Sequence, residues 1–558
     1  MKVINSLFKD KNSDHAYFLP LGGSGEIGMN LNLYGYKDNW LIVDCGVSFK
    51  DSKVIGADVF MPNIDAIIEN NLNVCGMFIT HAHEDHIGGV HHLWPHIRCP
   101  IYTTPFSGYL LKQRLIDYGL LEKANLNIVN KESKFEIGPF KLELINISHS
   151  ILEANSLLIT LGKKKIFHTG DWKIDNDPAI GNKPNSKRLK EIGKSGVSAM
   201  ICDSTNANVK GFSGSEKSIE KGIYNLIKGY KGRVFVAMFA SNVERILTLS
   251  NIAKKTNRQL GAIGRSMWRM IKASKSVGYL KEKHIFHEER NLKNFSDHNF
   301  LAICTGSQGE PLGALNRIAD ETHPHIRFKK GDRIVFSSRM IPGNEVSINN
   351  LINKLVYKGV DVVFPKAKNI HVSGHPGQEE LKMMYSWINP SILIPVHGEA
   401  IHIKAHAELA KKNGIEEVLK TKNGQLIRLC NNKADIIAEL PTGKMAVNGD
   451  ELISTESNFF KERKKMLFNG VVTINFVFSD VGDLQELPRI KFLSVVNSVE
   501  QEELIELSEY LNDEIKSFIP FNVSKEKQLR DYLNKKVKKF IINKFDKSPS
   551  IILDIIYI

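Results

Sequence analysis

The segment His81 to His86, with the sequence HAHEDH, constrains this chain more than any other. It directly follows an apolar run at 74–80 that predicts a buried strand, so its side chains would project from the carboxyl end of that strand. Three imidazoles and a carboxylate within six residues form a dense set of nitrogen and oxygen ligands. A histidine-rich surface turn would crowd the same groups without a charge partner. The segment therefore favours a metal site on a loop at a sheet edge.

Further ligands are expected from distant parts of the sequence, because six residues cannot complete two metal sites. The same arrangement, an apolar strand that ends in a potential ligand, recurs three times: His149 follows 142–148, Asp171 follows 166–168, and His397 follows 392–396. Ligands at strand ends are held by rigid elements, which suits a preorganised metal site.

Residues 23–28 (GSGEIG) match the glycine pattern of dinucleotide-binding loops. Such a loop opens a helix whose N-terminus faces the pyrophosphate. Here residues 30–34 alternate polar and apolar with period two, which predicts a strand. We therefore expect a tight turn close to another backbone rather than a nucleotide site.

Composition sets the broad class of protein. The chain has 558 residues, 42% hydrophobic and 24% charged, which predicts a soluble protein of two or three domains. No stretch approaches 18 apolar residues, so no membrane segment is expected. Six scattered cysteines without a C-x-x-C pair fit a reducing cytoplasm and exclude a disulfide framework. The net charge of +14 favours a polyanionic partner such as nucleic acid.

The texture of the chain changes along its length. β-rich runs extend to about 205, helices alternate with buried strands from 215 to 365, and β-rich runs return at 368–425. Asp171 and His397 are 226 positions apart, yet they would share one site, so a domain must be inserted between them. An insert beside a metal centre creates a cleft in which an extended polymer fits. The predicted boundaries are 1–213 for the first part of the main domain, 214–367 for the insert, 368–455 for the return segment, 456–480 for a linker and 481–558 for a C-terminal domain.

The ligand set matches a known pattern. His81, His83, Asp85, His86, His149, Asp171 and His397 resemble the dinuclear metal site of the metallo-β-lactamase superfamily. Further motifs are LGGSGEIGMN at 21–30, DSTN at 203–206, FASN at 239–242, GRSM at 264–267, TGSQGEP at 305–311 and SGH at 373–375. From about 16 to 470 the chain resembles the bacterial ribonuclease J family, in the β-CASP branch of that superfamily. The resemblance implies an α/β fold: a metallo-β-lactamase αββα sandwich, an inserted α/β β-CASP domain and a smaller C-terminal α+β domain.

The resemblance also implies two divalent metal ions, most simply zinc, with manganese or magnesium as alternatives. His81, His83 and His149 would hold one ion, Asp85, His86 and His397 the other, and Asp171 would bridge them. Two such ions lower the pKa of a bridging water and stabilise the attacking and leaving oxygens of an in-line displacement. Hydroxide would then attack phosphorus and leave a 5′-phosphate on the downstream product.

Two more catalytic residues and a phosphate pocket are expected. Asp203 follows an apolar strand and is expected to accept a hydrogen bond from a ligand imidazole. By resemblance, His375 would donate a proton to the departing 3′-oxygen. The residues that resemble the family's pocket for a nucleotide phosphate are Ser241, Asn242, His371, Val372, Ser373, Gly374 and His375. Hydroxyls, an amide and exposed backbone N–H groups suit phosphate oxygens.

The expected function is therefore 5′-to-3′ exonuclease and endonuclease activity on single-stranded RNA, in RNA maturation and decay, with a preference for a 5′-monophosphate. A DNA nuclease of the same fold is the first alternative. A small-ester hydrolase (a lactonase or thioesterase) is the second, although the long insert and the positive charge argue against it. By resemblance, the C-terminal region would mediate a homodimer or homotetramer, and the protein would be cytoplasmic without membrane contact.

His402 and His406 have the i, i+4 spacing that can bind a metal on a helix. The more ordinary interpretation is a solvated helix face, and we expect that here.

Overall fold

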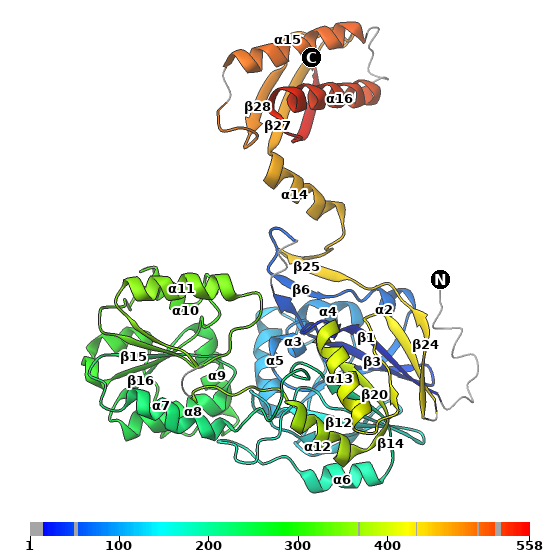
Figure 1. Ribbon diagram of the computed structural model, residues 1–558. Coiled ribbons are helices and arrows are strands. Elements are labelled where there is room, and N and C mark those ends of the chain that lie inside the picture. The colour runs from blue at the N-terminus through cyan, green and yellow to red at the C-terminus, as the bar shows by residue number, and fades with distance from the viewer. Residues whose placement is uncertain (1–14, 50–53, 366–368, 431, 499–500, 519–525) are drawn as a thin grey trace. The chain divides into compact units, whose positions relative to one another are not determined.

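The computed structural model describes residues 15–49, 54–365, 369–430, 432–498, 501–518 and 526–558 (Figure 1). The chain divides into two compact units, one of residues up to 48 with 61–442 and the other of 49–60 with 443–558. Within the described residues, no helix is long and apolar enough to cross a membrane. The domain boundaries expected from the sequence remain predictions.

The first sheet of the larger unit has eight strands. Its β1, β3 and β4 pair antiparallel, whereas β4, β7, β8 and β9 run parallel. In sheet order the strands are β24 Lys433–Glu439, β23 Gln425–Cys430, β1 Ala16–Gly22, β3 Leu31–Tyr36, β4 Asn39–Val43, β7 Asn73–Ile79, β8 Ile101–Thr103 and β9 Leu126–Ile128. The helices that accompany them are α2 Asp65–Glu69, α3 Glu84–Ile87, α4 Val90–Ile97 and α5 Pro105–Asp117.

The second sheet has seven strands and packs face to face with the first. One buried cluster combines Phe18 and Phe78 of the first sheet with Leu157 and Ile394 of the second. In sheet order its strands are β10 Lys134–Ile137, β11 Phe140–Asn146, β12 Asn155–Leu161, β13 Lys164–His168, β14 Val197–Asp203, β20 Pro390–Val396 and β22 Glu417–Val418. Its opposite face shares a core with α6 Ser186–Lys194, α12 Gln378–Ile388 and α13 Ala400–Lys412. This is the expected αββα sandwich.

The insert is a five-stranded sheet whose neighbouring strands are all parallel. In sheet order the strands are β16 Gln259–Ile263, β17 Phe300–Cys304, β15 Val234–Ala237, β18 Arg333–Phe336 and β19 Asp361–Val363. Its helices are α7 Ile219–Ile227, α8 Val243–Lys255, α9 Arg265–Ser276, α10 Ala314–Ala319 and α11 Glu345–Tyr357. Figure 1 shows α10 and α11 on one face of the sheet and α7 and α8 on the other. The predicted α/β insert is confirmed, and the carboxyl ends of its parallel strands share one edge.

The smaller unit has the expected α+β character. Its three-stranded sheet, in order β28 Arg489–Leu493, β27 Val471–Phe478 and β29 Ser550–Tyr557, buries one face against α15 Gln501–Ser517 and α16 Glu526–Phe545. Residues 471–478, within the predicted linker 456–480, form β27, which is the central strand because it pairs with both β28 and β29. Val472, Ile474 and Phe476 are buried. The remaining elements are β5 Ser48–Phe49, β6 Val59–Pro62, β25 Lys444–Asn448, β26 Glu451–Ser454 and α14 Asn458–Asn469.

Candidate metal centre

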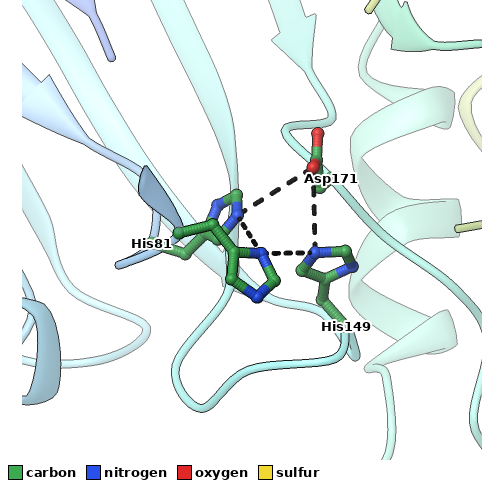
Figure 2. A group of neighbouring side chains, drawn as sticks. His81, His149 and Asp171 are labelled. Atoms are coloured by element: carbon green, nitrogen blue, oxygen red, sulfur yellow. Dashed lines mark hydrogen bonds and ion pairs between the residues drawn. The ribbon is translucent and has the colours of Figure 1, made fainter. Parts of the chain in front are cut away.

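The first group of candidate ligands consists of His81, His83, His149 and Asp171. His83 Nδ1 lies 3.1 Å from His81 Nε2 and 3.0 Å from His149 Nε2. Asp171 Oδ2 lies 3.9 Å from His81 Nε2 and 3.7 Å from His149 Nε2. Figure 2 shows the rings of His81 and His149 and the carboxylate of Asp171 facing one another. Four potential donors therefore surround one point.

The second group consists of Asp85, His86, Asp171 and His397. His86 Nε2 lies 3.2 Å from Asp171 Oδ2 and 3.6 Å from Asp85 Oδ2, and His397 Nε2 lies 3.2 Å from Asp85 Oδ2. Asp171 Oδ2 thus faces donors of both groups. The structure brings together all seven candidate ligands, although His81 and His397 are 316 positions apart.

Local structure explains why these side chains meet. His81 follows β7, His149 follows β11, Asp171 follows β13 and His397 follows β20, so strand ends hold them. His397 has φ of +51°, a left-handed conformation that costs a non-glycine residue energy. Its N–H donates to the Gly23 carbonyl over 2.6 Å.

The loop at 23–28 therefore supports a ligand rather than a nucleotide. Residues 31–36 after it form β3, so the expected strand is confirmed. Gly23 has φ of +85°, and a Cβ there would lie 2.3 Å from Asn30 Oδ1. The glycine is required for a close backbone approach.

The protonation of the rings suits a metal. Thr80 Oγ1 donates to Asp44 Oδ2 over 2.9 Å, so it accepts from His81 Nδ1 over 3.0 Å. Asp44 Oδ2 also accepts from His86 Nδ1 over 2.7 Å, and the Gly374 carbonyl accepts from His149 Nδ1 over 2.6 Å. In each ring Nδ1 carries a proton. The Nε2 lone pairs of His81 and His149 face the first group, as metal-binding histidines require, whereas His86 Nε2 lies 3.1 Å from the donor Asn30 Nδ2.

The donor spacing also suits a metal. A tetrahedral zinc site with bonds of about 2.0–2.1 Å requires donors about 3.3 Å apart, and the first group spans 3.0 to 3.9 Å. His397 Nδ1 and Nε2 are buried without hydrogen-bond geometry, although Nδ1 lies 2.7 Å from Asp171 Oδ1. The residues therefore fit a divalent ion in each group.

Burial and charge divide the rings into two kinds. Burial lowers the pKa of His81 and His149, and it lowers the pKa of His83 to about 4. Burial also acts on His397, but Asp171 and Asp85 outweigh it and raise its pKa to about 10. The first group is thus rich in neutral nitrogen donors, and the second is rich in carboxylate charge.

Asp44 belongs to the candidate site and was not among the residues predicted from the sequence. It directly follows the apolar strand β4, has φ of +66°, is fully buried, and accepts from Thr80 N over 2.7 Å and from His86. The sequence does contain a signal for Asp44, because a carboxylate directly after an apolar strand is the same arrangement that predicted Asp171 as a ligand.

Asp203 and His375 form a pair beside the two groups. Asp203 Oδ2 lies 2.8 Å from His375 Nδ1, while Asp203 Oδ1 lies 3.7 Å from His397 Nδ1 and accepts from Thr205 N over 2.8 Å. The imidazole at hydrogen-bond distance from Asp203 is therefore that of His375. Burial lowers the pKa of His375, but Asp203 and Asp171 outweigh it, and the pKa is raised.

Three of the seven candidate phosphate-pocket residues, Ser241, Gly374 and His375, lie next to the metal centre. Ser241 Oγ lies 3.0 Å from His83 Nε2, and the Gly374 carbonyl accepts from His149. A Cβ at Gly374 would lie 2.6 Å from Ser150 Oγ and 2.9 Å from His149 Cε1, so only glycine fits. Ser373 Oγ accepts from Asn206 Nδ2 over 2.8 Å.

Two of the candidates are occupied by the protein itself. Asn242 Oδ1 accepts from Arg245 N over 3.0 Å and caps α8, while its Nδ2 donates to Glu216 Oε1 over 2.9 Å. Val372 is 8% exposed, and its side chain faces Gly214. The Asn242 amide is thus engaged within the protein, and the Val372 side chain is buried.

The expectation of a solvated face at His402 and His406 is wrong for His406. His406 is fully buried, and its Nδ1 lies 2.9 Å from Ser204 Oγ. Its ring stacks on Tyr385 with 5.9 Å between centroids. The buried hydroxyl of Ser204 is the partner of its Nδ1, which periodicity alone does not reveal.

The fold and the site together define a metal-binding hydrolase of the metallo-β-lactamase type. Three family models match the chain: "Beta-lactamase superfamily domain" over residues 39–184, "Ribonuclease J, beta-CASP domain" over 231–355, and "Zn-dependent metallo-hydrolase RNA specificity domain" over 360–419.

Similar proteins of known name identify the family within this class of hydrolases. Ribonuclease J of Sinorhizobium meliloti is 39% identical over 479 residues, which are 84% of this chain and 85% of the relative. Ribonuclease J 1 of Streptococcus pyogenes is 37% identical over 81% of each chain, and ribonuclease J of Helicobacter pylori is 32% identical over 96% of this chain and 78% of the relative. The protein belongs to the ribonuclease J family. A solved structure of an Enterococcus faecalis protein of unknown function shares the fold, with a TM-score of 0.53, 17% identity, and coverage of 74% of this chain and all of the other.

Proposed function

We propose that this protein is a metal-dependent ribonuclease with 5′-to-3′ exonuclease and endonuclease activity on single-stranded RNA. The observation that carries the proposal is the meeting of two four-donor groups at one carboxylate oxygen of Asp171, beside the His375–Asp203 pair. Family membership supports RNA as the substrate. The net charge of +14 favours a polyanion over a small ester.

Two zinc ions are the proposed cofactors. His81, His83 and His149 would hold one ion and Asp85, His86 and His397 the other, with Asp171 between them. When bound, two such ions supply an acidified water and neutralise charge on the reacting phosphate. The tautomers set by Thr80 and the Gly374 carbonyl turn the Nε2 lone pairs of His81 and His149 toward one ion, and Asp44 holds the Nδ1 proton of His86, whose Nε2 lies 3.1 Å from Asn30 Nδ2.

His375 is the proposed proton donor to the departing 3′-oxygen. A carboxylate only accepts, so the proton between His375 and Asp203 is on Nδ1. Asp203 and Asp171 raise the pKa of the ring, which favours a second proton on Nε2, the proton that the ring would transfer. Asp203 thus positions and charges the ring.

The pocket at Ser241, Ser373 and Gly374 is the proposed site for the 5′-phosphate. Ser241 precedes the N-terminus of α8, where the helix dipole favours an anion. Because Ser241 contacts His83 and Gly374 contacts His149, the pocket sits a fixed distance from the metal centre. A pocket so close to the reacting phosphate would select a 5′-monophosphate and exclude a triphosphate.

The remaining proposals concern context. The protein would act in the cytoplasm on maturing and decaying RNA, and it would assemble as a homodimer or homotetramer through the smaller unit.

The deciding experiment compares RNAs that differ only at the 5′ end. A 3′-labelled single strand with a 5′-monophosphate is incubated with protein whose zinc and manganese contents have been measured. We expect release of mononucleotides from the 5′ end, cleavage of internal sites in a circular RNA, and loss of both activities after chelation. A matched DNA strand and a lactone or thioester panel serve as competitors. Metallated protein that cuts the DNA or the esters but leaves the RNA intact would refute the proposal.

A further inference from the structure

A buried ion pair lies behind the proposed phosphate pocket and takes no part in the chemistry above. Arg245 on α8 is 1% exposed, and its Nη2 donates to Glu216 Oε1 and Oε2 over 2.8 and 2.9 Å. Glu216, in the short helix Glu216–Ser218, is also 1% exposed. Burying two charges costs free energy. Of the two side chains, that of Arg245 extends to a residue of the proposed pocket.

The second terminal nitrogen of Arg245 faces His371. Nη1 lies 3.2 Å from His371 Nδ1 and also donates to the Ser337 carbonyl. A guanidinium has donors only and stays charged, so His371 Nδ1 must be the acceptor. An imidazolium would have a donor at both nitrogens. His371 is therefore neutral, with its proton on Nε2.

The charges that face His371 agree with this geometry. Burial lowers its pKa to about 3; Arg245, Arg339 and Lys173 act in the same direction, and Glu216 opposes them. The contact of the His371 ring with Arg245 is made through Nδ1, on the opposite side of the ring from Nε2. A neutral ring thus keeps one N–H available to a ligand.

We propose that Arg245 is a positioning residue for the 5′-phosphate pocket. It holds His371 as the neutral Nε2–H tautomer, so that the ring offers a terminal phosphate a hydrogen-bond donor and not a cation. Through the same pair, Glu216 holds Asn242, the cap of α8. This inference rests on the proposed function, since it assigns His371 to the site for the 5′ end.

The first test reads the tautomer directly and does not depend on activity. Zinc-loaded protein labelled with ¹⁵N in the histidine rings is studied by NMR, and His371 is assigned as the signal lost in His371→Gln. We expect the neutral Nε2–H pattern throughout pH 5.5–8. An imidazolium or Nδ1–H pattern would overturn the inference, whatever the substrate proves to be.

The second test uses two substitutions that leave the buried ion pair intact. The preference is the ratio of kcat/KM for 5′-monophosphorylated over 5′-hydroxyl RNA. His371→Gln places an amide N–H near the Nε2 position and is expected to keep this preference within about threefold. The shorter amide in His371→Asn reaches only the Nδ1 position. The preference is therefore expected to fall about 10-fold or more, the usual cost of one hydrogen bond to a charged group. Equal losses in both variants would overturn the inference, whereas wild-type protein without a preference would refute the proposed function.

The third test removes Arg245 without leaving a lone buried charge. In Arg245→Gln/Glu216→Gln both charges are gone, and thermal unfolding checks the fold. Burial, Arg339 and Lys173 still lower the pKa of His371 in this variant, so the ring stays neutral, but Arg245 no longer fixes its tautomer. The ¹⁵N pattern of His371 should then change from Nε2–H alone to a mixture with Nδ1–H, and the preference for a 5′-monophosphate should fall with it. An unchanged Nε2–H pattern would overturn the role of Arg245.

Discussion

The metal centre and the proposed phosphate pocket are neighbours held in place by different means. Ligands of the centre occupy strand ends of the sandwich, and their rear nitrogens bond to Thr80, Asp44 and the Gly374 carbonyl. The pocket depends on a helix cap and on one buried ion pair, Arg245–Glu216. The ligands of the centre are thus placed by strand ends, whereas the α8 side of the pocket is held by side chains. Substitutions should therefore separate metal binding from recognition of the 5′ end.

The largest effect is expected from Asp171→Ala. This removes the oxygen that faces both donor groups, and we expect kcat/KM for RNA to fall at least about 10³-fold, since each tenfold costs only 1.36 kcal/mol of transition-state stabilisation. Bound metal, measured by elemental analysis, should fall together with activity. The matched control is Asp435→Ala on the exposed strand β24. Full activity in Asp171→Ala would refute the shared-carboxylate arrangement.

A smaller loss is expected from Asp44→Asn, which does not touch a metal. An amide cannot accept from His86 Nδ1 and also keep both bonds from Thr80. Loss of such a partner typically weakens metal affinity about 10–100-fold. Competition with a chelator measures the affinity, and Asp65→Asn on the surface helix α2 is the control. Unchanged chelator sensitivity would mean that Asp44 supports the fold alone.

Ser241→Ala should affect the pocket more than the centre. The hydroxyl is a proposed phosphate ligand and contacts His83, so we expect the preference for a 5′-monophosphate to fall roughly 3–10-fold, as for one hydrogen bond. Metal content should stay at the wild-type level. Ser386→Ala on α12 is the matched control. Loss of metal with an unchanged preference would place Ser241 with the centre.

The smallest effect on catalysis is expected from Glu244→Gln, and its readout is stability. Burial, followed by the charge of Glu216, raises the pKa of Glu244 from 4.5 to about 7. A raised carboxyl pKa gives stability that is present at low pH and lost as pH rises through about 7. The free energy of unfolding of the variant should therefore be close to that of the wild type near pH 5 and exceed it by as much as about 3 kcal/mol at pH 8.5. Denaturant unfolding at both pH values measures this, and equal wild-type stability at both would contradict it.

The sequence predicted the sandwich, the insert and the convergence of seven candidate ligands. Strand-end placement is visible in sequence because an apolar run followed by a polar residue marks the edge of a sheet. His149, Asp171 and His397 were found in this way. Asp44 follows the same rule, but it has no neighbouring histidine to draw attention to it.

The residues that support the pocket could not be predicted from the sequence. Glu216 and Arg245 are ordinary charged residues 29 positions apart, and nothing in their surroundings marks them as a fully buried pair. Asn242 looked like a phosphate donor, yet it caps α8 because the chain turns into a helix there. Tertiary burial decides such roles, and periodicity does not report it.

Gly374 couples the proposed pocket to the metal centre. Its carbonyl accepts a hydrogen bond from the His149 ring, and the absence of a Cβ allows its backbone to lie close to Ser150. A shift of this loop would drag a metal-binding ring with it. If the 5′ end binds here, the rigid backbone of this loop fixes the distance between the 5′ end and the bond that is cleaved. The length of each released product would then be a property of the fold.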